Sequence, residues 1–162
     1  MPVNLSNITV LSDQARADTG YTHVARITAA DIIAADAGAG NAGTINLAAV
    51  VAGHMVDKVG FNLLTNAVVS DSGATLTMSV GYTGTTTAWV SAVSILGTAT
   101  PIVAGGGSTF KTFTGASTLV VTLTPASGKN LSAVTAGLVD IYFRLVQTLK
   151  LSNPGPTGTL YV

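Results

Sequence analysis

Alternating apolar and polar residues run through positions 53–81, the most regular pattern in the chain. The second half of this stretch has an apolar residue at every other position: Ala74, Leu76, Met78 and Val80. The first half has a similar row, interrupted by Asp57, made of Met55, Val59, Phe61 and Leu63. Because successive side chains of a strand point to opposite faces, each half predicts a strand with one buried face. Residues 70–73, Ser-Asp-Ser-Gly, are typical of a turn, so the stretch predicts a β-hairpin.

The same alternation predicts further strands at residues 21–28, 44–51, 88–96, 117–124 and 136–148, and two short ones flanking the glycines at 105–107. In the last long strand one face holds Val139, Ile141, Phe143 and Leu145, and the other holds Leu138, Asp140, Tyr142, Arg144 and Val146. Alanines near residues 29–37 allow a short helix or helical turn. About eight strands separated by turns predict an all-β fold, an antiparallel and jelly-roll-like β-sandwich.

The two ends of the chain lack this regular pattern. We expect an extended N-terminal arm over residues 1–20, the sandwich over 21–150 and a Pro/Gly-rich C-terminal extension over 151–162. The first segment is either a partly disordered terminus or an arm that docks on a neighbouring molecule. If the arms dock, the contacts come from their apolar residues: Leu5, Ile8, Val10, Leu11, Leu160, Tyr161 and Val162.

Charge is sparse in this chain of 162 residues. Charged residues make up 9%, against about 25% in typical globular domains, and seven Lys and Arg balance seven Asp. Little repulsion therefore keeps copies apart, which favours a protein that works inside an assembly. The sequence has no cysteine, no visible secretory signal and no apolar run long enough to span a membrane.

Residues able to carry catalysis are few. His23 and His54 fall on different predicted strands, without the three or four ligands of a zinc site. Asp57 next to Lys58, and Asp140 near Arg144 on one strand face, are interpreted as charge pairs at the solvent or at an interface. No nucleophile motif is present, so we expect no enzyme activity, no cofactor and no metal.

Two weaker patterns are also best explained by structure. The glycines at 38, 40 and 43 lack the Lys-Ser/Thr of a phosphate loop, and the scattered basic residues form no patch for nucleic acid. Trp89 is the only tryptophan, and we interpret it as a core or sheet-edge anchor rather than a platform for ligand stacking.

Four segments together resemble the small jelly-roll cement or decoration proteins on the capsids of tailed bacteriophages. They are HMVDKVGFNLLTN, ATLTMSVGYTG, TLVVTLTPASGKNL and GLVDIYFRLVQ, within residues 54–147. The resemblance lies in the pattern of strands and turns. Where such relatives often carry an acidic residue after the GYTG-like turn, this chain has Thr85-Thr86-Thr87.

The resemblance implies a non-enzymatic virion protein. Such proteins commonly form homotrimers, bind across subunits of the major capsid protein on the outer surface of the head, and stabilise it. The chain would then be made in the cytoplasm of the host bacterium and would bind neither nucleic acid nor membrane. The main alternative is a fibre- or baseplate-associated β-module involved in host attachment or glycan binding. A bacterial surface or carbohydrate-binding module, or a cupin-type enzyme, are further alternatives.

Overall fold

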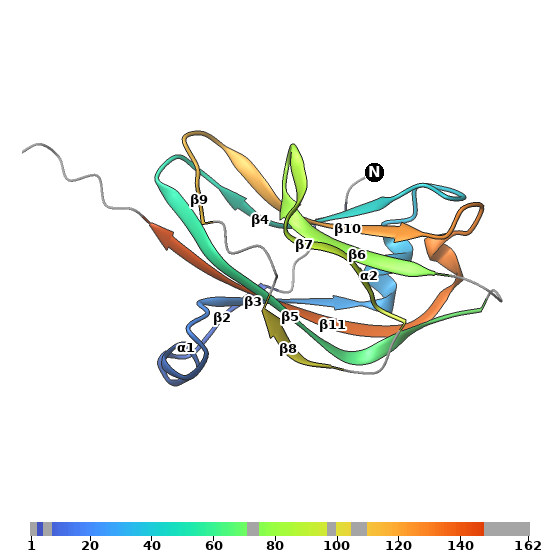
Figure 1. Cartoon of the computed structure of the whole chain (residues 1–162), viewed down its shortest axis with the longest axis horizontal. Coiled ribbons are helices and arrows are strands. Elements are labelled where there is room, and N and C mark those ends of the chain that lie inside the picture. The colour runs from blue at the N-terminus through green and yellow to red at the C-terminus, as the bar shows by residue number, and fades with distance from the viewer. Residues whose placement is uncertain (1–2, 5–7, 71–74, 97–99, 105–109, 148–162) are drawn as a thin grey trace, which may run out of the picture.

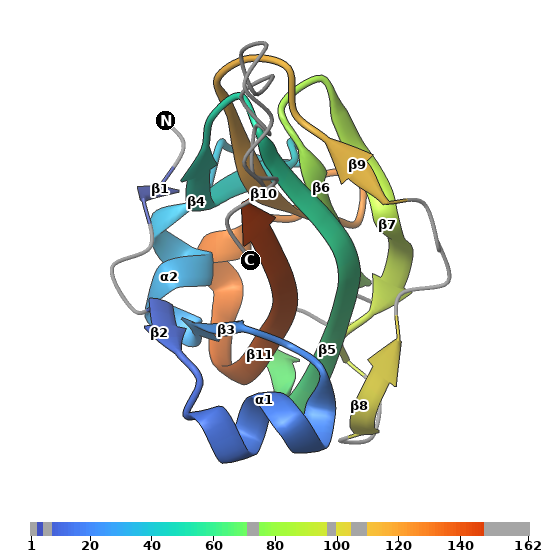
Figure 2. The same ribbon diagram turned by 90° about the vertical axis from the view of Figure 1, so that its left-hand side faces the viewer.

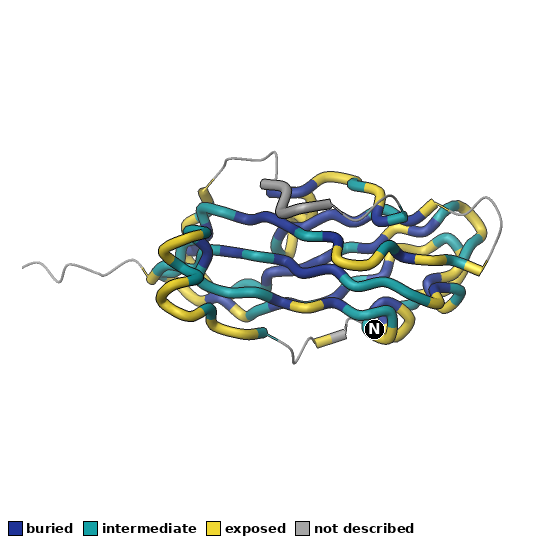
Figure 3. Tube along the Cα trace, turned by 90° about the horizontal axis from the view of Figure 1, so that it is seen from below, coloured by how far each residue is buried: buried dark blue, intermediate teal, exposed yellow. Residues whose placement is uncertain are grey.

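The computed structural model describes residues 3–4, 8–70, 75–96, 100–104 and 110–147. Two β-sheets pack face to face (Figures 1 and 2). The buried apolar side chains of both sheets form one core cluster. Along the strands, buried positions alternate with more exposed ones, as the tube in Figure 3 shows. The predicted all-β sandwich is confirmed.

Five strands form one sheet, which we call sheet A, in the order β1-β4-β10-β6-β7. They are β1 (Val3–Asn4), β4 (Gly43–Val50), β10 (Ser117–Pro125), β6 (Leu76–Tyr82) and β7 (Thr85–Ser94). The second sheet, sheet B, has the order β2-β3-β11-β5-β8, and β9 pairs with β5. Its strands are β2 (Ile8–Val10), β3 (His23–Thr28), β11 (Val134–Gln147), β5 (His54–Val69), β8 (Thr100–Ala104) and β9 (Lys111–Thr112).

Four antiparallel pairs are nested within this order. β6 pairs with β7, β5 with β8, β4 with β10, and β3 with β11. Successive pairs fall in opposite sheets, as when one long hairpin is folded over into two layers.

The predicted hairpin over residues 53–81 is wrong. β5 lies in sheet B next to β11, whereas β6 lies in sheet A next to β10. Both strands bury the predicted face, with Phe61 at 4% and Met78 at 0% exposure. Alternation determines which side chains are buried but not which strand is the hydrogen-bonded neighbour. Here β5 and β6 contribute to one core from opposite sheets.

A bulge in β5 corrects one predicted core position. The register with β11 shifts between the pairs Arg144–Lys58 and Leu145–Val56, so Asp57 is an extra residue in the ladder. The inward row therefore contains Val56, fully buried, and not Met55. The bulge also leaves two consecutive polar residues, Asp57 and Lys58, on the outer side of sheet B.

The helix expected near residues 29–37 is confirmed as α2 (Ala29–Ala34). The hydroxyl of Thr28 accepts a hydrogen bond from the backbone N–H of Asp31, and the Asp31 carboxylate accepts one from the N–H of Thr28, a reciprocal cap. Ile32 is fully buried, and α2 packs against β11 and the 3-10 turn η1 (Leu131–Ala133). It covers one end of the sandwich (Figure 1).

The extended arm expected over residues 1–20 differs from the structure. β1 pairs with β4 of sheet A, β2 pairs with β3 of sheet B, and α1 (Asp13–Thr19) is a helix. The N-cap Ser12 accepts from the N–H of Ala15, and Gly20 ends the helix in a left-handed conformation. The helix was missed because none of its residues is buried, so it leaves no apolar periodicity.

Candidate functional site

The two sheets differ in their content of charged residues. None of the five strands of sheet A contains a charged residue. Across its outer side, register pairs join small uncharged residues: Thr44 with Thr122, Thr122 with Ser79, and Thr124 with Thr77. Among the described residues, the charges lie on sheet B, on β9, on the helices and in loops. The outer side of β4, β10 and β6, which we call the neutral face, is therefore rich in hydroxyl groups and free of charge.

The outer side of sheet B carries two ion pairs, and they differ from the predicted ones. Arg26 of β3 donates from Nε and Nη2 to the carboxylate of Asp140 on β11, both at 2.8 Å. Arg144 of β11 binds Asp57 of β5 in the same forked way, with its Nε at 2.7 Å from Oδ1. The sequence had paired each aspartate with a residue of its own strand. The partners lie on neighbouring strands because side chains directly opposite across a sheet approach more closely.

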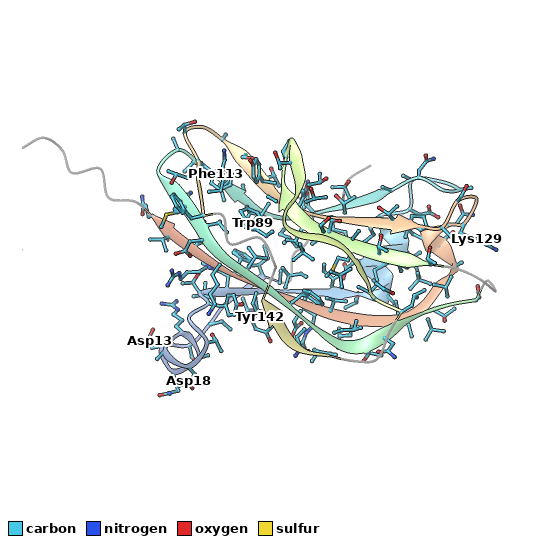
Figure 4. The ribbon with its side chains drawn as sticks, in the orientation of Figure 1. Asp13, Asp18, Trp89, Phe113, Lys129 and Tyr142 are labelled. Carbon is cyan, nitrogen blue, oxygen red and sulfur yellow. The ribbon has the colours of Figure 1, made fainter. Side chains whose placement is uncertain are left out.

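Lys58 does not pair with Asp57 as predicted, and contacts the end of α1 instead. Its ammonium donates to the carbonyl of Thr19 at 2.5 Å and lies 4.3 Å from the centre of the Tyr21 ring. Tyr21 in turn contacts Tyr142, with 5.6 Å between ring centres. A cation near the last carbonyls of a helix is favourable. The hydrogen bond from Lys58 therefore ties the C-terminal end of α1 to sheet B, and Asp13 and Asp18 project from the helix beyond the sandwich (Figure 4).

Acid should weaken the Asp57–Arg144 pair. The hydrogen bond from Arg144 holds the pKa of Asp57 below its ordinary value, so the pair stabilises the fold above the unfolded pKa of about 3.9 and loses its effect as pH falls through the folded value. We expect Arg144→Gln to lower the free energy of unfolding more at pH 7 than at pH 2, measured by urea denaturation at each pH.

A second carboxylate, that of Asp36, also contributes to the acid dependence of stability. The pKa of Asp36 is also lowered, chiefly by the side chain of Ser132, so Arg144→Gln should reduce the acid dependence without abolishing it. An equal loss of stability at both pH values would contradict a role for the Asp57 charge.

The predicted docking residues are only partly assembled by the fold. Leu5, Leu160, Tyr161 and Val162 lie outside the described residues. Ile8 packs against the core, and the half-buried Leu11 donates from its N–H to the carbonyl of Thr22 at 2.9 Å. Val10 is 56% exposed at the sheet B edge. Of the three described residues, Val10 is the one whose side chain is left for a neighbour.

Sequence reasoning missed an aromatic cluster. The ring centre of Tyr82 lies 5.7 Å from that of Trp89 and 5.5 Å from that of Phe113. The Lys111 ammonium lies 5.0 Å from the centre of the Tyr82 ring. Trp89 is 2% exposed, so its role as an anchor is confirmed, but it is not isolated from other aromatics. Figure 4 labels Trp89 and Phe113. These residues come from β6, β7 and the segment around β9, so only long-range packing brings them together.

The two histidines serve local packing. His23 stacks on Phe143 at 5.2 Å between ring centres, its Nδ1 lies 2.7 Å from the Thr22 hydroxyl, and burial lowers its pKa, with Arg16 acting in the same direction. The Nδ1 of His54 accepts from the N–H of Val51 at 3.0 Å. Within the described part of the chain, no three His, Asp or Glu side chains gather as metal ligands.

The described helices are all too short or too polar to cross a membrane. Comparison of this chain with protein-family models, with curated proteins and with solved structures found no match.

Proposed function

We propose that this protein is a non-enzymatic structural component of a bacteriophage virion, a cement or decoration protein that binds across major capsid protein subunits on the outside of the head. The observation that carries the proposal is the neutral face. A sheet whose five strands lack any charge can be covered by another protein without removing a charged group from water, which is a costly step.

The composition of the neutral face suits such contact. Thr124 is exposed and Thr77 is half-buried, and threonine hydroxyls can both donate and accept hydrogen bonds to a partner. Charged residues are depleted from the cores of protein interfaces in the same way. The ion pairs and α1 on sheet B would then face solvent, so the molecule would bind through one sheet. The resemblance in strands and turns supports the capsid as the partner and a homotrimer as the working form.

The test places a positive charge on the neutral face. Thr124 of β10 and Ala49 of β4 are exposed, so Ala49→Lys with Thr124→Lys should leave the fold intact. We expect the double variant to bind undecorated heads from the same source at least about tenfold more weakly, measured by co-sedimentation, because the contact would bury unpaired ammonium groups.

A control places a single lysine on the other sheet. Thr9 of β2 is exposed and opposes Val24, on the outer side of sheet B, so Thr9→Lys should bind like the unaltered protein. Equal weakening by both changes would contradict the assignment of the contact to the neutral face. Failure of the unaltered protein to bind heads would contradict the cement function itself. Light scattering supplies the oligomeric state, expected to be a trimer of the 16.2 kDa chain.

A further inference from the structure

Two hollows adjoin each other beside the aromatic cluster. The first, of about 270 Å³, is lined by Tyr82, Thr85, Ala88, Trp89, Phe110 and Lys111. The second, of about 260 Å³, lies between the β6–β7 turn and the segment from Lys111 to Ser117. Both are lined by Tyr82 and Lys111, which therefore stand at the boundary between them. Each hollow is smaller than the ~300–1,000 Å³ of sites for drug-sized ligands, but the two together reach that range.

The lining combines three kinds of group. Phe110 is 68% exposed, so the ring offers an apolar surface at the mouth of the first hollow. Hydroxyl groups of Thr85, Thr83, Thr114 and Ser117 border the two hollows. Among the described residues that line the two hollows, Lys111 is the one charged residue, and none of them carries a carboxylate. Its ammonium lies over the Tyr82 ring, which fixes its position at the boundary.

We propose that these hollows bind a short stretch of an acidic saccharide, with a sugar ring against Phe110, ring hydroxyls hydrogen-bonded to the bordering threonines and serine, and a carboxylate at Lys111. An aromatic ring presents a flat apolar surface to the C–H face of a sugar, while hydroxyl side chains match its hydroxyl groups. A lysine with no carboxylate beside it favours an anionic ligand through a charge-assisted hydrogen bond.

Nucleic acid fits these hollows less well. A single-stranded nucleic acid needs a positively charged groove and successive stacking platforms, whereas the hollows offer one cation and one exposed ring. The saccharide site involves β9 and the β6–β7 turn and does not depend on the proposed capsid function. It can be tested on the purified protein without heads.

The experiment titrates the protein with tetragalacturonate and, as a matched ligand, with the same oligomer whose carboxylates are methyl-esterified. Isothermal calorimetry measures binding, and the emission of Trp89, the only tryptophan, reports occupancy of the first hollow. We expect the acidic oligomer to bind and change this emission, to weaken with added salt, and to bind at least about tenfold more tightly than the ester.

Three variants locate the site. Lys111→Gln should remove the preference for the acid over the ester, and Phe110→Ala should weaken binding of both. Lys129→Gln, in the turn at the opposite end of β10, should change neither (Figure 4). Absence of heat and of any change in emission would overturn the proposal. So would equal binding of acid and ester, or binding that Lys111→Gln and Phe110→Ala leave unchanged.

Discussion

Gly81→Ala is expected to lower the free energy of unfolding by about 3 kcal/mol, the upper end of the usual range for overpacked sites. A methyl group at position 81 would lie 2.1 Å from the carbonyl oxygen of Thr85 and 2.8 Å from the Cα of Thr86. Both are backbone atoms of β7, so the clash cannot be relieved by turning a side chain. The strand itself would have to move.

The structural reason is the shape of the β6–β7 hairpin. Its tip rises from sheet A in Figure 1, and the backbone of β7 passes directly over Gly81 as the hairpin bends. Thr83 of the turn and Thr86 of β7 line a hollow together with Val120 of β10, which pairs with Gly81. Displacing β7 would therefore disturb the neutral face as well as the aromatic cluster.

Gly115→Ala is the matched control for Gly81→Ala. No atom lies within 4 Å of a methyl group added there, and its backbone does not need a positive φ. We expect its free energy of unfolding to remain within about 0.5 kcal/mol of the unaltered protein, as for most surface changes. Urea denaturation of both variants gives the comparison. Similar stabilities for the two would show that β7 can shift at little cost and would contradict the prediction.

Arg26→Ala is expected to destabilise the protein by about 2 kcal/mol. Asp140 is 3% exposed and accepts both hydrogen bonds of the Arg26 guanidinium, so its carboxylate would lose its cation while still buried. Removing one partner of a fully buried pair costs about 3–5 kcal/mol. We expect a smaller loss of stability here because the Arg26 side chain is 53% exposed and water screens its charge.

Two further variants test this explanation. Arg26→Ala combined with Asp140→Leu should recover part of the loss, because the double change removes the buried charge together with its partner. Asp13→Ala breaks the pair with Arg16, in which the Asp13 side chain is 99% exposed, and should change stability very little. A double variant less stable than Arg26→Ala would contradict the role of the unpaired carboxylate. Chemical denaturation in urea supplies each value.

Most of the strands, and the buried face of each long one, could be predicted from the sequence. The alternation in β11 assigned Val139, Ile141 and Phe143 to the core, and all three are at most 1% exposed. The predicted strand at 21–28 and the helical turn after it are present as β3 and α2. These features were predictable because strand alternation and helix capping depend on residues close together in the chain.

Prediction from the sequence failed at one position of β5 and over the helix α1. The bulge at Asp57 shifts the alternation by one residue, so the buried side chain is that of Val56 and not the predicted Met55. The helix α1 has a capping serine and a terminal glycine, but no apolar stripe, because it buries none of its residues. The bulge could not be recognised because it shifts the pattern by a single residue. The helix α1 could not be recognised because its sequence resembles that of a polar loop.

The tertiary fold was needed to identify the neighbours of each strand and side chain. It placed β5 and β6 in opposite sheets, paired Asp140 with Arg26, and brought Tyr82, Trp89 and Phe113 into one cluster. The absence of charge from these strands is visible in the sequence, but the neutral face exists only because β4, β10 and β6 are neighbours in sheet A. The physical reason is range: burial follows from the local period of a strand, whereas each neighbour is chosen by contacts between residues far apart in the chain.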